Sequence, residues 1–375
     1  MALLALSLAL TSSTGAVEES SKMKGMSFVG WWYGCYETLD SNQSLELLPG
    51  IGVEWVSILA TWYTDNKSST EIYPDPDMTP TDEGVVIAIR KAHELGLKVM
   101  LKPHVDPVSG EWRGEIEFED EADWELWFDN YTAFIVHYAQ IAEQESVELF
   151  CIGCEYCLTV SRPEWLDVIQ AVRSVYHGPL TYASNYDNYV NVMFWDYVDY
   201  IGIDAYFELT NDNDSSLEEL IAAWNGHADD VEEWWASNYP DKEILFTEIG
   251  YRSIDGANAR PWDWWSDGEV DLEEQAMCYE AFFETAWKRS WLKGVFWWAW
   301  EAYPDQGGPY DTNYTPHGKL AEDVIRQYFL EEETTTPTST ATTTPPESTT
   351  YAPSALGALP ALPVAVAVLL RRKRK

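Results

Sequence analysis

Short apolar runs rich in β-branched and aromatic residues alternate with amphipathic stretches over residues 24–332. Runs of the first kind, bounded by turn residues, predict strands, and the stretches between them predict helices. The alternation favours a parallel sheet covered by helices. The predicted strands are 26–34, 54–64, 98–105, 147–155, 179–186, 199–207, 243–250 and 293–300. The predicted helices include 82–95, 122–145, 163–176, 217–237, 271–289 and 318–330.

Residues 82–95 illustrate the helix signals. Thr81 can act as an N-cap, and Gly96 is typical of a residue that ends a helix. Acidic residues occupy the first turn, where they favour the positive end of the helix dipole. The apolar positions that share one face are Val85, Ile89 and Ala92.

Eight predicted strands alternating with helices indicate an α/β fold, a (β/α)8 TIM barrel over residues 22–332. The pattern defines the first and fifth helices poorly. A doubly wound open sheet is the alternative, although no G-x-G-x-x-G motif follows the first strand. In a barrel of this kind the catalytic groups gather at the carboxyl ends of the strands.

Both ends of the chain have the composition of processing segments. Residues 1–21 carry an apolar run at 2–10 followed by small residues, as in a signal peptide, although the usual basic start is missing. Residues 333–353 form a Thr/Pro-rich linker, and residues 354–375 form an apolar tail that ends in RRKRK. This end resembles surface sorting signals such as those that archaeosortases process; a simple membrane anchor is the alternative. We therefore expect an extracellular protein anchored at the cell surface.

Composition narrows the possible partners. The chain has 63 acidic and 23 basic residues, a net charge of −40, which opposes binding to nucleic acid or anionic lipid. A dense acidic surface also keeps proteins soluble in high salt, so a salt-tolerant source is a second hypothesis. The 20 Trp and 22 Tyr residues suit stacking on the apolar faces of sugar rings, although core filling is the ordinary use of most of them.

Three of the five cysteines form a C-x-x-C-x-x-C motif, namely Cys151, Cys154 and Cys157. Similar spacings occur in metal and iron–sulfur sites. However, no further cluster of Cys or His completes a tetrahedral set, and we expect Cys151 and Cys154 to lie on opposite faces of their strand. We therefore predict no metal site. Cys157 would be able to form a disulfide in an oxidising exterior, with a partner that the sequence leaves open.

Two glutamates lie where predicted strands end, Glu155 at the fourth strand and Glu248 at the seventh. A single glutamate there can be an ordinary rim charge. Two of them in a Trp-rich barrel mouth favour glycoside hydrolysis, which uses a pair of carboxylates. The remaining candidates, all predicted to bind substrate, are His104, Trp112, Arg113, Asn185, Asp204, Tyr206, Trp298, Trp300 and Trp62.

Long runs of the chain resemble glycoside hydrolase family 113, over about residues 24–330. The runs are TWYTDN (61–66), TEIYPDPDMTPTDE (70–83), AHELGLKVMLKPHVD (92–106), GEWRGEI (110–116), DYIGIDAYF (199–207), LFTEIGYRS (245–253), RPWDWW (260–265) and GVFWWAWE (294–301). The resemblance implies a retaining (β/α)8 hydrolase. Characterised members of that family are mainly β-1,4-mannanases.

The same resemblance implies roles for individual residues. Glu155 matches the acid/base, and Glu248, within FTEIGY, matches the nucleophile. Tyr206 matches an aromatic residue that often hydrogen-bonds the nucleophile. Trp298 or Trp300 matches the platform under the sugar at the cleavage site.

One position departs from the pattern of the wider clan. Many relatives carry Asn directly before the acid/base, where it contacts the sugar 2-hydroxyl. Here that position is Cys154, so Asn185 or His104 would have to make the contact.

These roles imply cleavage of β-1,4-mannosidic bonds in mannan or glucomannan by double displacement, with no cofactor. Glu248 must attack as a carboxylate, whereas Glu155 must start protonated, its pKa raised by burial and by the charge of Glu248. A carboxyl separation of about 5–5.5 Å would give retention. Hydrolysis of another β-linked glycan and glycan binding without catalysis are the alternatives. We expect a monomer.

Overall fold

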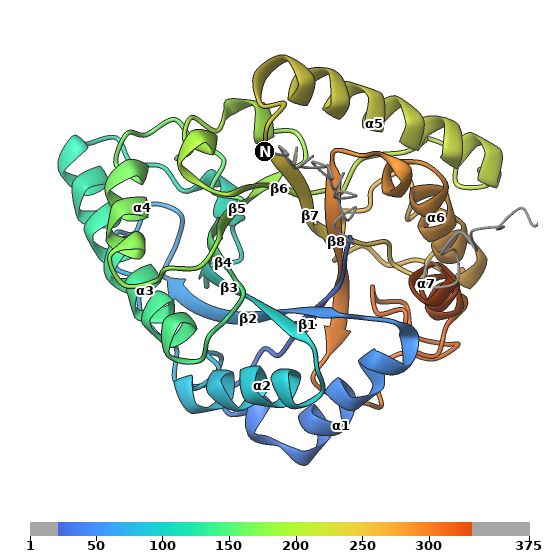
Figure 1. The fold of residues 1–375 in the computed structure, drawn as a ribbon, viewed down its shortest axis with the longest axis horizontal. Helices are drawn as coiled ribbons and strands as arrows, with labels where there is room; N and C mark the ends of the chain where they lie inside the picture. The colour runs from blue at the N-terminus through green and yellow to red at the C-terminus, as the bar shows by residue number, and fades with distance from the viewer. Residues whose placement is uncertain (1–21, 332–375) are drawn as a thin grey trace, which may run out of the picture. The chain divides into compact units, whose positions relative to one another are not determined.

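Eight parallel strands form a closed barrel in sequence order, with β8 paired to β1 (Figure 1). The computed structural model describes residues 22–331. The prediction of a (β/α)8 TIM barrel is confirmed, and the open doubly wound sheet is excluded. The strands are β1 (Met23–Val29), β2 (Trp55–Thr64), β3 (Lys98–Pro107), β4 (Leu149–Cys154), β5 (Leu180–Asn185), β6 (Tyr200–Asp204), β7 (Glu243–Ile249) and β8 (Leu292–Glu301).

Helices surround this barrel on its outer side (Figure 1). They are α1 (Leu39–Leu47), α2 (Asp82–Glu94), α3 (Glu121–Gln144), α4 (Trp165–Arg173), α5 (Leu217–Asn238), α6 (Leu272–Glu284) and α7 (Leu320–Glu331). Between β5 and β6 the described chain forms only the short 3-10 turns Tyr189–Asn191 and Trp195–Tyr197. The indistinct fifth helix of the sequence pattern is therefore absent, and its place is taken by an aromatic-rich connection.

The ends of α2 follow the predicted signals. Thr81 Oγ1 accepts a hydrogen bond of 2.9 Å from the backbone N–H of Gly84, which satisfies a free donor of the first turn. Gly96 follows the helix with φ of +78°, a left-handed conformation that glycine adopts without a steric penalty. The predicted inner face is buried at Val85, Ile89 and Ala92.

Two strand predictions need correction. The first strand begins and ends earlier than the predicted 26–34, because the chain leaves the sheet at Gly30 and Gly34 adopts a left-handed φ of +73°. In β4, Cys151 and Cys154 do not lie on opposite faces. The register with β5 shifts between them, as in a β-bulge, and both pack into the inner core of the barrel.

The barrel interior is filled rather than open. An inner cluster draws side chains from strands all around the barrel, while a larger outer cluster joins the strands to the helices. Strand runs are apolar on both faces because both faces are buried. The inner cluster consists of Met23, Trp55, Met100, Leu149, Cys151, Cys154, Ala183, Leu245 and Phe296.

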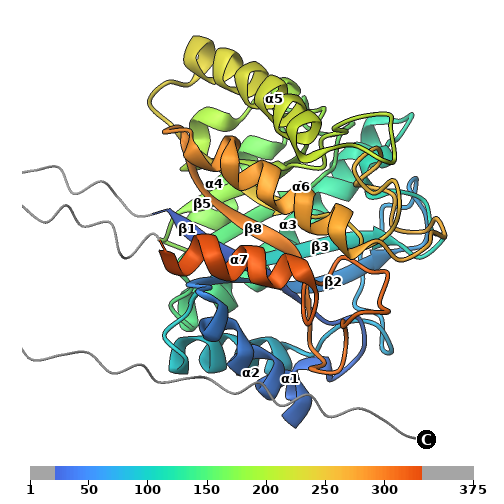
Figure 2. The ribbon, with the colours of Figure 1, turned by 90° about the vertical axis from the view of Figure 1, so that its right-hand side faces the viewer.

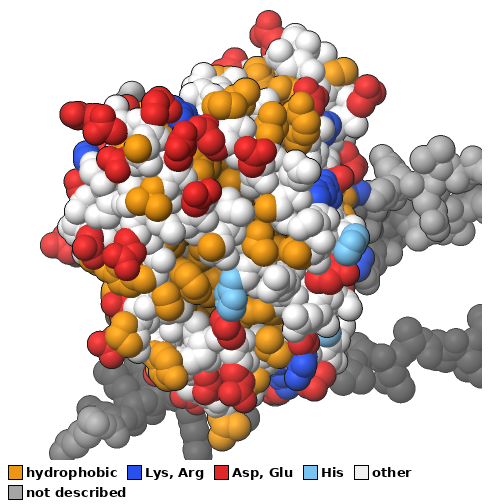
Figure 3. All heavy atoms as spheres, turned by 90° about the vertical axis from the view of Figure 1, so that its left-hand side faces the viewer, with side chains coloured by type: hydrophobic (Ala, Val, Ile, Leu, Met, Phe, Trp, Pro, Cys, Tyr) orange, Lys and Arg blue, Asp and Glu red, His pale blue; other side chains and the backbone are white. Residues whose placement is uncertain are grey.

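Among the charged side chains on the face shown in Figure 3, acidic ones prevail and basic ones are few. The predicted signal peptide (1–21), linker (333–353) and apolar tail (354–375) lie outside the described residues. Among residues 22–331, no helix combines the length and apolar character needed to cross a membrane.

Candidate active site

Both predicted catalytic glutamates lie at the carboxyl end of the barrel. Glu248 is in β7, and Glu155 directly follows β4. The long loops after β3, β7 and β8 lie on this side of the barrel (Figure 2). Glu155 has a φ of +57°, which an L-residue other than glycine rarely adopts. A conformation of this kind costs of the order of 1–3 kcal/mol and is found mainly where the surrounding structure fixes a functional side chain.

Glu248 is buried and held through both carboxylate oxygens. Oε1 accepts a hydrogen bond of 2.5 Å from Lys102 Nζ, and Oε2 accepts one of 2.7 Å from Tyr206 OH. The contact that the family resemblance implied for Tyr206 is therefore present. Two donors fix the orientation of the carboxylate and leave it no freedom to rotate away from the barrel mouth.

Lys102 also contacts a second carboxylate. Its Nζ lies 3.2 Å from Asp204 Oδ1, and all three side chains of this cluster are buried. Thr247 Oγ1 donates a further hydrogen bond of 2.8 Å to Asp204. Burial lowers the pKa of Lys102, but the neighbouring acidic groups, Asp204 first and then Glu248, outweigh it and raise that pKa well above its ordinary value. Lys102 is thus a cation beside Glu248.

The two glutamates have different surroundings. Burial, followed by the negative charge of Asp204, raises the pKa of Glu155 to about 8, against the opposing effect of Arg113. The pKa of Glu248 is raised as well, by burial first and then by the charge of Asp204, although the Lys102 ammonium and the Tyr206 hydroxyl oppose this rise. Arg113 NH1 lies 4.0 Å from Glu155 Oε2, whereas Lys102 Nζ lies 2.5 Å from Glu248 Oε1. Glu248 therefore has a close cation that favours its ionised form, whereas Glu155 has none closer than 4.0 Å among the described residues.

Arg113 links three groups near Glu155. Its guanidinium binds both oxygens of Asp106, at 2.6 and 3.1 Å. Its NH1 donates to Cys154 Sγ at 3.1 Å and lies 3.1 Å from His104 Nδ1. Burial, then the charges of Arg113 and Lys102, lower the pKa of His104 well below its usual range, so this histidine is neutral.

Comparison of the chain with models of known protein families identifies its family. The model of Glycoside Hydrolase Family 113 matches residues 27–319, which include both glutamates. The chain belongs to glycoside hydrolase family 113. The resemblance of the sequence runs is confirmed, and the protein is a glycoside hydrolase.

Solved structures agree with this assignment to family 113. A GH113 β-1,4-mannanase is 31% identical with a TM-score of 0.75, and the match covers 82% of this chain and 99% of that one. The β-mannanase AaManA from Alicyclobacillus acidocaldarius, in complex with ManMIm, is 33% identical with a TM-score of 0.75, covering 82% and 97%. The fold is shared with a β-glucuronidase from Ruminococcus gnavus, which is 13% identical with a TM-score of 0.55. That match covers 82% of this chain and 50% of the glucuronidase. Among curated proteins, no sequence matches.

Four residues of this family 113 enzyme that were predicted to bind substrate do not lie at the barrel mouth. His104 and Asp204 have no exposed surface, so they support the buried cluster instead of lining the cleft. Trp62 lies on the outer face of β2, where its Nε1 donates to Tyr138 OH at 2.9 Å. Trp300 is buried against α1, with Nε1 donating to Ser44 Oγ at 2.9 Å.

The other predicted contacts remain at the mouth. Trp298 is partly exposed, and the centroid of its ring lies 6.0 Å from that of Trp31. The peptide bond between Trp298 and Ala299 is cis. Trp112 is exposed in the loop after β3. Asn185 ends β5, where its Nδ2 donates to Asp187 at 2.7 Å. Asn185 and His104 are the two residues predicted to contact the sugar 2-hydroxyl in place of Cys154. His104 is fully buried, as is Cys154, so Asn185 is the better placed of the two.

Sequence reasoning missed Lys102 and Thr247 as site residues. Lys102 stands in the predicted strand 98–105, and a lysine within an apolar strand signals a buried counter-ion. Met100 faces the inner core, so the period of two also places Lys102 inside the barrel. Thr247 gave no comparable signal, because threonine is ordinary in a strand.

Two groups of potential metal ligands overlap the catalytic site, His104 with Cys154 and Glu248, and Cys154 with Glu155 and Asp204. In each group the ligand atoms lie within 4.8 Å of one another. Lys102 Nζ and Arg113 NH1 already contact members of these groups, and a cation would be repelled by both. These residues therefore do not fit a metal.

Proposed function

We propose that the protein is a β-1,4-mannanase that cleaves mannan or glucomannan within the chain and retains the anomeric configuration. The observation that carries this proposal is the contrast between the two glutamates. Glu248 is ion-paired with Lys102, while the pKa of Glu155 is raised to about 8. The similarity to two β-mannanase structures supports the choice of substrate.

In the first step Glu248 attacks the anomeric carbon. The bond to the leaving oxygen breaks, and Glu155 gives that oxygen its proton, so that a covalent glycosyl-enzyme and a free sugar hydroxyl are formed. Tyr206 and Lys102 hold the attacking carboxylate in position through their hydrogen bonds. As the carboxylate becomes an ester, its charge is lost from the site.

In the second step Glu155, now a carboxylate, removes a proton from water. The water oxygen bonds to the anomeric carbon and the ester bond to Glu248 breaks. Loss of the Glu248 charge in the intermediate removes one of the influences that raise the pKa of Glu155. Lys102 stabilises the returning carboxylate as a leaving group. Two inversions give net retention.

A substrate panel tests the proposal. Purified enzyme is incubated with mannan, glucomannan, xylan and β-glucan, with reducing ends and product sizes measured. We expect activity on the first two, with a rapid shift to mid-length products, and NMR of fresh products should show the β-anomer first. Activity confined to xylan or β-glucan would point to a hydrolase of another glycan. Binding to mannan without new reducing ends would point to a non-catalytic glycan-binding protein.

We also propose that the enzyme is exported and held at the cell surface. Support comes from the apolar run at 2–10, the Thr/Pro-rich residues 333–353 and the apolar tail with its basic end. Mass spectrometry of both termini of the protein from its source cells, together with fractionation, tests this. A cytoplasmic protein that retains residues 1–21 would contradict it.

A further inference from the structure

The loop between β7 and α6 displays two neighbouring tryptophans. Trp264 is 69% exposed and Trp265 is 61% exposed, whereas most of the large aromatic side chains of the described chain are buried. The two rings lie 5.8 Å apart at 89°, and Trp262 lies 6.0 Å from Trp265. Exposed apolar surface concentrated in this way is unfavourable in water and marks sites of interaction.

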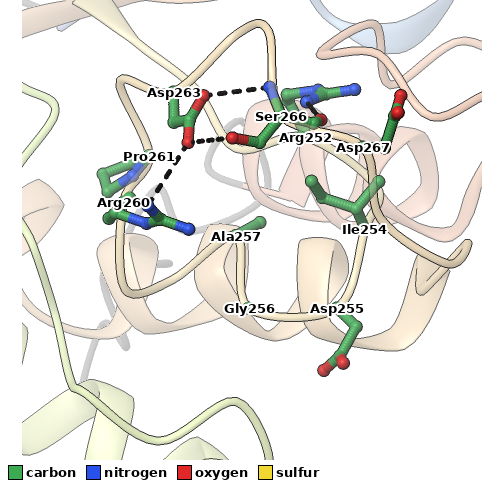
Figure 4. A pocket seen from close by; sticks show the side chains of 10 residues that line it. All are labelled: Arg252, Ile254, Asp255, Gly256, Ala257, Arg260, Pro261, Asp263, Ser266 and Asp267. Atoms are coloured by element: carbon green, nitrogen blue, oxygen red, sulfur yellow. Dashed lines mark hydrogen bonds and ion pairs between the residues drawn. The ribbon is translucent and has the colours of Figure 1, made fainter.

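This loop is fixed from within by its own hydrogen bonds. The Asp263 carboxylate accepts from the backbone N–H groups of Trp265, at 3.3 Å, and Ser266, at 3.1 Å, and from Ser266 Oγ at 2.5 Å. Arg252 NH1 donates to the Ser266 carbonyl oxygen (Figure 4). The small pocket drawn there is lined by residues of this loop, including Asp263 and Ser266, and by neither glutamate. The exposed rings are thus held in place before any partner arrives, which reduces the entropy lost on binding.

Tyr314 and Tyr206 connect this loop to Glu248. Tyr314 OH donates to the Pro261 carbonyl oxygen at 2.6 Å, and the Tyr314 ring lies 6.3 Å from the ring of Tyr206. Tyr206 in turn hydrogen-bonds Glu248. On the other side, Trp262 Nε1 donates to Glu208 Oε1 at 3.0 Å, in the loop after β6. The loop that carries the tryptophans therefore lies at the same end of the barrel as Glu248 and is joined to its surroundings.

We propose that Trp264 and Trp265 form a sugar-binding platform for units of the glycan that lie beyond the cleaved bond. This inference rests on the proposed function. A pyranose ring presents an apolar C–H face that stacks on an indole, while its hydroxyls need acceptors at the edge. Asp267, two residues after Trp265, is exposed and supplies an acidic acceptor, whereas the Asp263 carboxylate is already bound within the loop. The net charge of −40 selects a neutral glycan over a polyanionic one.

The test compares long and short substrates in the double variant Trp264→Ala/Trp265→Ala. We expect KM for polymeric mannan to rise roughly ten-fold, which corresponds to ~1.4 kcal/mol. KM and kcat for a dinitrophenyl β-mannoside should stay at the wild-type values, because that substrate is too short to reach the platform. The matched control is Tyr197→Ala, which removes a 54% exposed aromatic from the turn before β6, at the opposite end of the barrel.

A second measurement separates this inference from the proposed function. Electrophoresis through gels that contain mannan is run with Glu248→Ala, with and without the two tryptophan substitutions. Retardation that the tryptophan changes abolish supports the platform, even if mannan proves not to be the polymer cleaved fastest. Equal KM values on polymer and equal retardation in both proteins would overturn it. If the wild type cleaves mannan and the double variant has the same KM and the same retardation, the platform is rejected while the proposed function stands.

Discussion

Lys102 Nζ lies 2.5 Å from Glu248 Oε1, with both side chains buried. Inside a protein an unpaired carboxylate is strongly disfavoured, so this contact favours the ionised form of Glu248 against the burial that raises its pKa. The same ammonium also neutralises Asp204, at 3.2 Å. Lys102 is therefore the cation that the buried carboxylates of Glu248 and Asp204 share.

The first prediction removes this cation. In Lys102→Met the pKa of Glu248 should rise, because the ammonium that lowers it is gone. Nucleophilic attack needs the carboxylate, so the acidic limb of kcat/KM should move to higher pH and kcat should fall at least 10²-fold, as for loss of a strong electrostatic contact. The measurement is the pH profile of kcat/KM on mannan. An acidic limb at the wild-type position would contradict this role.

The control addresses stability. Breaking one partner of a buried ion pair costs about 3–5 kcal/mol, so Lys102→Met should also melt at a lower temperature. The double variant Lys102→Met/Asp204→Asn removes one negative charge along with the positive one. It should regain stability. Loss of the Asp204 charge also lowers the pKa of Glu248, so the acidic limb should move back towards the wild-type position. If the acidic limb of the double variant stays where it is in Lys102→Met while stability recovers, the charges of this cluster do not set the pKa of Glu248.

The second prediction concerns the nucleophile itself. Glu248→Ala should abolish hydrolysis and leave the fold intact, because the side chain makes contacts only within the local cluster. Azide can occupy the vacated space, so added azide should restore partial activity on an activated β-mannoside with an inverted, α-configured product. Product configuration is read by NMR. Near wild-type hydrolysis without azide would refute the assignment.

The strand pattern was predictable because it follows from burial. Runs such as β2 and β3 are buried on both faces and mostly apolar, which makes the number and order of the strands readable. The loops were not, since Gly30–Gly34 reads as a continuation of the first strand although it leaves the sheet. Local turns depend on contacts that a strand propensity does not contain.

The glutamates were predictable from their place at strand ends, but the aromatic contacts were not. Trp62 follows Trp55, an inner residue, by an odd number of positions, so the period of two places it outside the barrel. Trp300 should share the face of Trp298, yet the register of β8 with β1 shifts between residues 297 and 300. A bulge of this kind reverses the face and leaves no clear sequence signal.

The third prediction concerns salt. With a net charge of −40, repulsion between acidic side chains destabilises the compact state, and salt screens it over about 10 Å at 0.1 M. The unfolding midpoint should therefore rise from low to molar potassium chloride. Differential scanning fluorimetry across the series measures it. A midpoint indifferent to salt would reject the hypothesis of salt adaptation.

The fourth prediction concerns metals. The cysteine motif and the acidic cluster invite a test, but Lys102 and Arg113 already contact the candidate ligands. Elemental analysis should find no stoichiometric zinc or iron, and chelation should leave activity unchanged. About one metal ion per chain, lost together with activity, would overturn the assignment of a metal-free mechanism.

The last prediction concerns Glu155 and separates catalysis from binding. Its pKa of about 8 means that the acid form is present below that pH and is lost as the pH rises through it. Wild-type kcat/KM should therefore be bell-shaped with an alkaline limb near pH 8. In Glu155→Ala that limb should flatten, because the group that titrates is gone.

The substrate dependence of Glu155→Ala gives the sharper measurement. General acid assistance is worth roughly 10²–10⁴-fold for a sugar leaving group, whereas a dinitrophenyl β-mannoside needs little of it. The variant should therefore lose far more activity on mannan than on the aryl substrate. On the latter, a burst followed by slow turnover should appear, since water attack also lacks its base, and azide should accelerate turnover with a retained product. Equal losses on both substrates, with no burst, would move the acid/base role to another carboxylate at the barrel mouth.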